Sequence, residues 1–556
     1  MNGKINKTYI ISVFTIIFLS HINIANGQNP NEEVWAEAKK HAFIYADCAE
    51  NVSWILNGWV KYKCDSISHL FSECYSTKWN YHNAAADNYS SLVFHAYFIK
   101  PEWNKPDGVL YKTLDSSIIL CGNEDGKLPY VYDVKTQTRT KRASPEEIAE
   151  WLRDGLIRIC EIMGTDNIWY RELIKLSDTI IKMGEDQGGI INLIKNSKEP
   201  AEAAGNLMQT FARLTVFSGE IKYLEQAEKI ADYYLLGDVI KNVGNVDFAD
   251  HTCELVPGLA EVFIVEKKLN RSKFAQYHQP MRVLLDRILE VGINPETGIW
   301  FRKADLLKNA SGIGTCPDTW GYVLFAFENY DRATGENRYK KDILSFMDWF
   351  LKNRGNFDEL QDIWPTFKTG RFSADDWSDS YESMIILSNS YYDYKSEEVF
   401  DWLDWATIKS GQHRQKMTQK FGPGNGGHFD GSTGRTLCLH MMRCSQGVRP
   451  LPYIRGLGCG AVKKDKTLYI YLESQDSPWE GALVFDSPRE IHNKTRVDWA
   501  RINSAPSWFT IYPELSYKVS IDNNPPITVK GDKLIEGLPV KIKSDDHMKL
   551  VVEVKN

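Results

Sequence analysis

The chain has 556 residues, of which 43% are hydrophobic and 25% charged, and its formal net charge is −7 at pH 7. This composition is typical of globular proteins, and the negative charge argues against a nucleic-acid partner. A chain of this length exceeds what one small core holds, so we expect two domains.

The first residues predict a secretory signal peptide. Lys4 and Lys7 precede an apolar run over 9–19, and small residues follow up to Gly27. This is the order of a signal peptide, and the run is short for a membrane span. We expect cleavage after Gly27, with an uncleaved anchor as the alternative. No lipid-attachment cysteine lies near the cut and no later apolar stretch is long enough to span, so we predict an exported protein, periplasmic and without a membrane span when mature.

From about Glu32 to Arg443, apolar residues recur at three- and four-residue spacing, which predicts helices. Ser144, Pro145 and Glu147 are typical of a helix start, and the helix should run to about Met163. The predicted helices cover about 33–54, 83–99, 145–163, 166–185, 201–218, 220–236, 249–268, 272–291, 317–333, 337–353, 375–393 and 397–411. Paired helices can stack openly or close into a ring, and the lack of a fixed repeat weakens the open stack.

The pattern changes after about Gly447 to short apolar runs divided by turn residues, which predicts an antiparallel β-sandwich. The expected strands are 468–472, 482–485, 508–512, 517–521, 527–530 and 550–554. A glycine-rich stretch within Phe421–Pro452 is expected to join the two parts. We therefore predict a signal peptide (1–27), a helical catalytic domain (28–446) and a β-sandwich domain (447–556).

The ten cysteines all follow the signal segment. Cys48, Cys64 and Cys74 lie close enough in sequence for a local bridge, and export permits disulfides. We expect mostly buried thiols with one or two bridges. No paired C-x-x-C motif is present, so we predict no cysteine zinc site and no bound metal.

The segment Asp247-Phe-Ala-Asp250-His251-Thr-Cys-Glu254 is the richest candidate site. If a helix starts near Asp250, His251 and Glu254 share one face, three residues apart. A histidine beside a carboxylate can transfer protons near neutral pH. A structural helix cap with a buried pair, or two metal ligands, are the alternatives.

A second acidic cluster, Asp375-Asp376-Trp377-Ser-Asp379-Ser-Tyr381-Glu382, follows Arg371. Paired carboxylates can act as general acid and base or as nucleophile, and an arginine can bind a carboxylate through two parallel hydrogen bonds. Because Asp and Ser also favour helix starts, a purely structural role is an equal alternative.

Three further residue groups complete the candidates. Gly426-Gly427-His428 precedes Arg435 and His440, and its glycines would let a ligand approach the backbone, although an inter-domain turn is also possible. Asp318 and Trp320 could bind hydroxyls and stack on a sugar ring, and core packing of Trp320 is as plausible. His82, between Trp79 and Asn83, is a weaker candidate for sugar binding.

The sequence also lacks several common enzyme signatures. It has no P-loop, no dinucleotide fingerprint between strand and helix, and no G-x-S-x-G elbow. Kinase, dehydrogenase and esterase activities are therefore disfavoured.

The whole layout resembles the (α/α)-toroid carbohydrate-active enzymes of polysaccharide-degrading Bacteroidetes. The Asp250-His251-Thr-Cys-Glu254 and Gly426-Gly427-His428 stretches most resemble the oligosaccharide dehydratase type of ulvan-degradation systems. In layout the resemblance covers nearly the whole mature chain. It implies a mainly α fold, an (α/α)6-type helical toroid followed by the β-sandwich domain. It also implies a lyase that removes water from a uronic acid at the non-reducing end of an acidic oligosaccharide and leaves a 4,5-unsaturated residue.

Such a reaction needs a base, an acid and a clamp for the substrate carboxylate. His251, His428 and Tyr381 are candidates for base and acid, with Asp250 or Glu254 orienting His251. Arg371 or Arg435 would be the clamp, and no cofactor is required.

Two other functions stay open, because a fold alone does not decide among them. A glycoside hydrolase of glucuronidase type would use two carboxylates from Asp376, Glu382 and Glu254. A non-catalytic glycan-binding protein would use Trp320 and Trp377 as stacking platforms.

Overall fold

The computed structural model describes residues 30–73, 76–122, 126–248, 253–296, 298–309, 312, 319–352, 374–391, 398–405, 407–408, 419, 428–489, 491–492, 495–522 and 524–555. The predicted signal peptide lies outside these residues, as do four candidate site residues, Asp250, His251, Asp318 and Arg371. Asp376, Trp377 and His428 lie in helices, but their side chains are outside the description.

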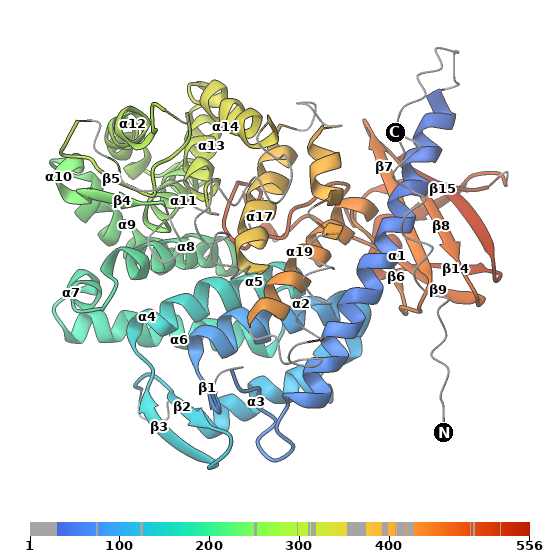
Figure 1. The fold of residues 1–556 in the computed structure, drawn as a ribbon, viewed down its shortest axis with the longest axis horizontal. Coiled ribbons are helices and arrows are strands. Elements are labelled where there is room, and N and C mark those ends of the chain that lie inside the picture. The colour runs from blue at the N-terminus through green and yellow to red at the C-terminus, as the bar shows by residue number, and fades with distance from the viewer. Residues whose placement is uncertain are drawn as a thin grey trace.

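The chain is mostly helical up to Ser445 and rich in sheet after it (Figure 1). The helices are α1 (Pro30–Tyr62), η1 (Tyr81–Tyr89), α2 (Ser90–Ile99), η2 (Pro101–Asn104), α3 (Val109–Cys121), α4 (Pro145–Glu150), η3 (Trp151–Ile157), α5 (Arg158–Met163), α6 (Ile168–Asp186), α7 (Ile190–Lys195), α8 (Pro200–Ser218), α9 (Ile221–Leu235), α10 (Val239–Val243), α11 (Leu255–Lys268), α12 (Lys273–Gly292), α13 (Tyr322–Thr334), α14 (Lys340–Lys352), α17 (Ala374–Ser390) and α19 (His428–Ser445). Residues 398–405 are also helical. Small ribbons pair β1 (Lys78–Trp79), β2 (Tyr130–Asp133) and β3 (Thr138–Arg142), and β4 (Asn245–Asp247) with β5 (Lys303–Asp305).

The predicted helix start at Ser144 is confirmed. The Ser144 hydroxyl accepts from the Glu147 backbone N–H, and the Glu147 carboxylate accepts from the Ser144 backbone N–H at 2.9 Å. This capping box satisfies two donors that the first turn leaves open. The helical path then continues through η3 and α5 to Met163, where the sequence predicts its end.

The glycine-rich residues 422–427 of the predicted joining region lie outside the described residues, and the rest of that region contains a helix that the sequence does not predict. Residues 428–445 form α19, although glycine, serine and threonine are poor helix formers. Leu437, Cys438, Leu439 and Met441 of this helix are buried, and α19 packs against α1, α2 and α17. Burial of these side chains outweighs the weak local preference, which the sequence pattern underestimates.

Two antiparallel sheets follow. One has the order β13-β12-β15-β8-β7 and the other β14-β9-β6. Their strands are β6 (Val448–Leu451), β7 (Leu457–Lys464), β8 (Thr467–Ser474), β9 (Trp479–Phe485), β12 (Ser516–Ile521), β13 (Ile527–Lys530), β14 (Leu538–Ile542) and β15 (Asp546–Val554), with a short helix α20 (Gly531–Glu536). Five of the six predicted strands lie within these elements. The sixth prediction, 508–512, is wrong, because that stretch is not a strand.

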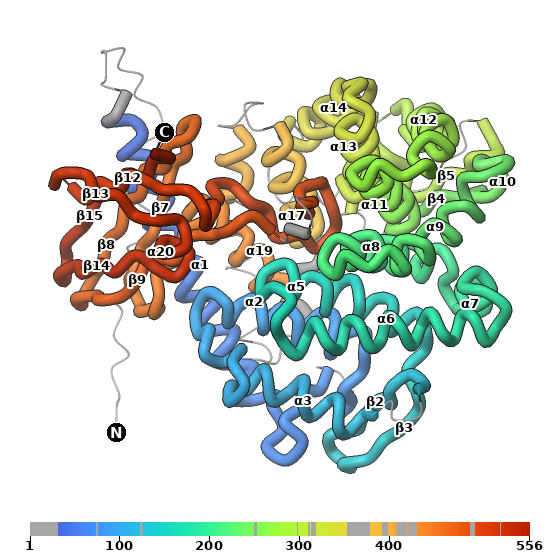
Figure 2. Tube along the Cα trace, turned by 180° about the vertical axis from the view of Figure 1, so that it is seen from behind, coloured from blue at the N-terminus to red at the C-terminus, as the bar shows by residue number. Residues whose placement is uncertain are grey.

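The residues predicted as 508–512 belong instead to a long connection between β11 (Thr495–Arg496) and β12. We call residues 497–515 the inserted loop, because in Figure 2 the chain leaves the sheets here and runs beside α17 and α8. Its contacts explain why it is not a strand. The Ala500 and Ile502 carbonyls accept from Asn329 and Arg213 at 2.8 and 3.1 Å, so backbone groups of the loop bond to helix side chains.

Helix α1 packs along β7 and β8 (Figure 1). These contacts cross the predicted domain boundary after residue 446, and the boundary itself stays a prediction. The close approach of α1 to β7 depends on small residues. A Cβ on Gly460 would lie 2.0 Å from the Ala38 carbonyl oxygen, and a Cβ on Gly458 2.7 Å from that of Ala42. Glycine therefore lets the strand backbone touch the helix backbone.

The predicted local disulfide and the predicted lack of a membrane span can both be compared with the described residues. Cys48 and Cys64 are free thiols, so they do not form a local bridge with each other, and Cys74 lies outside the described residues. In the described part of the chain, no helix is both long enough and apolar enough to cross a membrane.

Candidate functional site

A strongly polar cavity of about 170 Å³ lies among the helices and the inserted loop. Residues of η1, α2, α4, η3, α5, α8, α13, α17 and α19 line it, together with the residue before α11. The described lining comprises His82, Asn83, Ala86, Asp87, Ser91, Glu150, Arg153, Asp154, Arg158, Glu202, Glu254, Tyr322, Asp379, Ser432, Arg435, Ile502 and Asn503. Among these residues are six carboxylates, three arginines and one histidine, so the cavity suits a ligand rich in hydroxyl and charged groups.

Two π-helical segments bring much of this chemistry together. η1 carries His82, Asn83 and Asp87, η3 carries Arg153 and Asp154, and the two segments pack against each other. A π-helical turn holds an extra residue, is rare and is frequently found at functional sites. The two segments therefore support this cavity as the functional site.

His82 and Glu150 form a histidine–carboxylate pair at the cavity. The Glu150 carboxylate is hydrogen-bonded to Nδ1 of His82. The His82 side chain is 32% exposed and that of Glu150 only 7%, so the ring reaches the cavity while its partner is buried. A carboxylate on one ring nitrogen orients the imidazole and leaves the other nitrogen for proton transfer.

Arg153 connects three elements at the cavity. Its guanidinium lies 2.6 Å from Asp154 and 3.3 Å from Glu254, and it donates to the Asn206 amide oxygen at 2.8 Å. Burial opposes the charge, but Asp154 and Glu254 more than offset it and raise the pKa of Arg153 above its usual value. Glu254, a predicted catalytic residue, therefore lines the cavity as the partner of a permanently charged arginine.

Arg435, Tyr322 and two carboxylates of α17 form a second group. Arg435 lies 2.5 Å from Asp379 and 3.6 Å from Glu382, and the Tyr322 hydroxyl is 2.8 and 3.0 Å from the same two carboxylates. Burial, followed by these two negative charges, raises the pKa of Tyr322 well above its ordinary value. Tyr322 therefore keeps its proton and is a donor. The predicted clamp Arg435 does line the cavity, already paired with Asp379.

Arg158, the third cavity arginine, is bound differently. Its guanidinium donates to the Ser91 hydroxyl at 3.4 Å and lies 4.8 Å from the centre of the Phe94 ring. Burial, followed by the charge of Arg435, lowers the pKa of Arg158 to about 10. It is still a cation at neutral pH.

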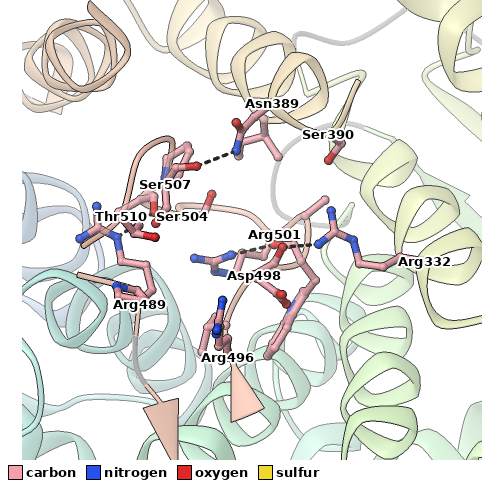
Figure 3. Close-up of a pocket in the computed structure, with 17 residues that line it drawn as sticks. Arg332, Asn389, Ser390, Arg489, Arg496, Asp498, Arg501, Ser504, Ser507 and Thr510 are labelled. Atoms are coloured by element: carbon pink, nitrogen blue, oxygen red, sulfur yellow. Dashed lines mark hydrogen bonds between the residues drawn. The ribbon is translucent and has the colours of Figure 1, made fainter. Parts of the chain in front are cut away.

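The inserted loop completes the cavity wall with Ile502 and Asn503. The Asn503 side chain accepts from Arg435 at 2.8 Å and donates to Asp154. The neighbouring residues Arg501 and Ser504 line a second cavity of about 140 Å³ (Figure 3). At this cavity Arg332 donates to the Asp498 carbonyl and Asn389 to that of Ser507, so side chains of α13 and α17 also hold the loop.

Two predicted site residues lie away from the cavity. Tyr381 is buried, and its hydroxyl lies 2.5 Å from Nδ1 of His440, whose Nε2 lies 3.1 Å from Asp404. Trp320 is fully buried and stacks on Phe350 at 4.8 Å, so it belongs to the core. Neither is among the lining residues. His82, Glu254 and Arg435 are the described candidates that the structure brings together.

Sequence reasoning missed most of the lining. The sequence predicts a helix from Pro145 to Met163 but assigns it no functional residue. Four lining residues lie on this helical path: Glu150, Arg153, Asp154 and Arg158. A signal was available, because these charged residues interrupt the apolar run Trp151-Leu-Arg-Asp-Gly-Leu-Ile-Arg-Ile-Cys160. Charges inside such a run are costly to bury unless they are paired and hydrogen-bonded, so they indicate a polar site within the helices.

Known proteins offer only one distant structural likeness to this chain. No family model matches the chain, and no curated protein matches it. A crystal structure of D-mannose isomerase aligns with a TM-score of 0.36 and 10% identity, over 54% of this chain and 84% of that one. This likeness is too distant to indicate an activity. Within the described residues, no group of three histidine, cysteine or acidic side chains is placed to hold a metal ion.

Proposed function

We propose that the chain is a carbohydrate-active enzyme, a hydro-lyase that removes water from a uronic acid at the non-reducing end of an oligosaccharide. The observation that carries this proposal is the His82–Glu150 pair in a polar cavity that also holds Arg158. A histidine oriented by a carboxylate supplies proton transfer, and a guanidinium supplies recognition of a carboxylate.

The chemistry divides into three tasks. A base removes the C5 proton, which is acidified when the neighbouring carboxylate is neutralised. An acid protonates the departing 4-hydroxyl, and a 4,5 double bond forms as water leaves. We assign His82 to one of the proton transfers, with Glu150 orienting it. Tyr322 is a candidate for the acid because it keeps its proton. The predicted residues His251 and His428 stay candidates for the other transfer, and the scheme needs no cofactor.

We propose that the helices form an (α/α)6-type toroid, with the cavity among its helices, and that the sheets after Ser445 form a β-sandwich. With an export signal over 1–27, the enzyme would work in the periplasm on imported oligosaccharides of ulvan type. On such oligosaccharides the enzyme would act at chain ends, and a small cavity suits a chain end better than a long open groove would.

A glycoside hydrolase is the second candidate. Glu150, Asp154, Glu202 and Glu254 line the same cavity, and hydrolysis needs a general acid and a second carboxylate across the scissile bond. A glycan-binding protein has less support, because Trp320 is packed in the core and offers no ring face to a sugar.

One assay separates the three candidates. The full chain is incubated with saturated uronate-ended oligosaccharides, and ultraviolet absorbance is recorded with product mass. Loss of one water with new absorbance supports the lyase. Release of a saturated monosaccharide without absorbance supports the hydrolase and contradicts the lyase. Binding without any product leaves only glycan recognition.

The role of His82 is tested by substitution. We expect His82→Asn and Glu150→Gln to lower kcat by about a hundredfold or more, the usual contribution of a proton-transfer group. His278→Asn is the matched control, because His278 forms a similar pair with Glu336 at 3.0 Å, on the surface and outside the cavity lining. Near-normal turnover in His82→Asn would remove His82 from the mechanism.

A further inference from the structure

The three arginines of the cavity differ in whether a carboxylate of the protein contacts the guanidinium. Arg153 and Arg435 each lie within 3.3 Å of a carboxylate. Arg158 has no carboxylate within 4.0 Å among the described residues, and its one hydrogen bond there is the 3.4 Å contact with Ser91. Its charge is therefore not neutralised by contact with a described group of the protein.

This arrangement is costly unless a ligand completes it. Arg158 is only 4% exposed, and moving a guanidinium out of water is expensive when no anion accompanies it. Neighbouring charges do not remove this cost, because Arg435 repels Arg158, and the attraction of Glu382 and Asp154 leaves the pKa of Arg158 below its ordinary value. An anion in the cavity would supply the missing partner.

Arg158 is also held ready for such a ligand. It is the first residue of α5, directly after η3, and the Phe94 ring beneath its guanidinium restricts its motion. A planar guanidinium matches a carboxylate through two parallel N–H···O bonds. The neighbouring lining residues Ser91, Asn83 and Ser432 offer polar groups for hydroxyls around that anion.

We propose that Arg158 binds the carboxylate of the uronic acid and so sets the preference of the cavity for acidic over neutral sugars. This inference rests on the proposed function, and it replaces Arg371 and Arg435 as the clamp. In the elimination, the same contact would neutralise the carboxylate and acidify the C5 proton. Arg158 would then contribute to turnover as well as to binding.

The test begins with binding that needs no turnover. Thermal unfolding and calorimetry of the full chain are recorded with D-glucuronate, with D-glucose and with D-glucose 6-sulfate. We expect glucuronate to raise Tm and to bind about tenfold or more tightly than glucose. Stabilisation by the sulfate ester alone would overturn the carboxylate assignment, and no stabilisation by either anion would overturn the anion site.

The residue is tested with Arg158→Met, which keeps most of the side-chain volume. We expect it to lose the preference for glucuronate, and Arg158→Lys to keep part of it. The matched control is Arg449→Met, because Arg449 is also buried, lies 3.4 Å from the Tyr97 ring centre and is outside the cavity lining. Unchanged glucuronate preference in Arg158→Met would overturn the proposal. If Arg158→Met does not fold, Arg158→Lys takes its place in the test. A glucuronate preference and a glucuronate Kd equal to those of wild type in Arg158→Lys would contradict a bidentate contact.

The two proposals fail in different ways. Arg158-dependent binding of glucuronate without elimination from oligosaccharides leaves the anion site standing and contradicts the lyase. Elimination that proceeds equally well in Arg158→Met supports the lyase and removes Arg158 from it. Comparing a uronate-ended oligosaccharide with its carboxyl-reduced form gives the corresponding kinetic test, in which only wild type should favour the acid.

Discussion

The Arg501 guanidinium and the Glu161 carboxylate form two hydrogen bonds of 2.8 and 2.7 Å, although 340 positions separate them in the chain. Both side chains are almost completely buried. Arg501 precedes Ile502 and Asn503 of the cavity wall, and Glu161 lies in α5, one turn after Arg158. This ion pair therefore fixes the inserted loop against the helix that carries the cavity arginine.

We expect Arg501→Met to lower the free energy of unfolding by about 3 kcal/mol, because the buried Glu161 then keeps only a 3.6 Å contact with Arg213 and a 3.4 Å hydrogen bond from the Ala505 backbone N–H. Burial raises the pKa of Glu161, but Arg501 and Arg213 outweigh it and hold that pKa below its ordinary value. The pair therefore stabilises the fold above the ordinary carboxyl pKa and loses this effect on acidification. Urea unfolding at several pH values checks this, and the difference from wild type should shrink at low pH.

The control for this variant is Arg455→Met, which breaks an exposed pair with Glu50 at 3.0 Å. We expect a change below about 0.5 kcal/mol there. Equal effects of the two substitutions would contradict the role of the Arg501–Glu161 pair.

A second prediction concerns the contact of α1 with β7. We expect Gly460→Ala to lower the free energy of unfolding by about 2 kcal/mol or more, because its Cβ would lie 2.0 and 2.2 Å from backbone atoms of Ala38 and Ala42. Chemical denaturation measures the effect. Lys464→Ala, at an exposed position of the same strand, should change stability little, and a tolerated Gly460→Ala would show that α1 can move away from the sheet.

A third prediction concerns pH. Burial raises the pKa of Glu172 in α6 from an ordinary 4.5 to about 7, against a small opposing effect of Lys175. The folded state therefore holds a proton that the unfolded chain releases above pH 4.5, and this stability is lost as pH rises through 7. The whole loss is about 3 kcal/mol. Glu172→Gln should remove this slope from stability profiles, and Glu185→Gln, at an exposed position of α6, should leave it in place.

A fourth prediction separates packing from sugar stacking at Trp320. We expect Trp320→Ala to cost about 4 kcal/mol, since the ring is fully buried against Phe350. At a temperature where the variant stays folded, glucuronate affinity should equal that of wild type. Trp103→Ala, at a half-buried position, should destabilise less. A loss of affinity without a loss of stability would restore Trp320 as a stacking platform.

Helix starts and strand positions were largely predictable, because they depend on neighbours within one turn or on simple alternation. The capping box at Ser144 and the strand at Leu468–Leu472 are examples, and both are found. α19 was not predictable in this way, since its local preference is weak and burial against α1 and α17 decides its form. Residues 508–512 have the aromatic and β-branched residues that favour a strand, but no strand pairs with them in the described part of the chain.

Local sequence patterns predict the mostly helical first part, the sheet-rich last part and the polar segments from which Glu254, His82 and Arg435 come. Which of these polar residues meet depends on the packing of distant segments. The tertiary structure joined Arg435 to Asn503 across 68 positions and Arg153 to Glu254 across 101. It also placed Tyr381 in a buried contact with His440, while Asp379 on the same helix lines the cavity. The physical reason is range: caps and periodicity act over a few residues, whereas charge pairing in a cavity depends on long-range packing that no local pattern records.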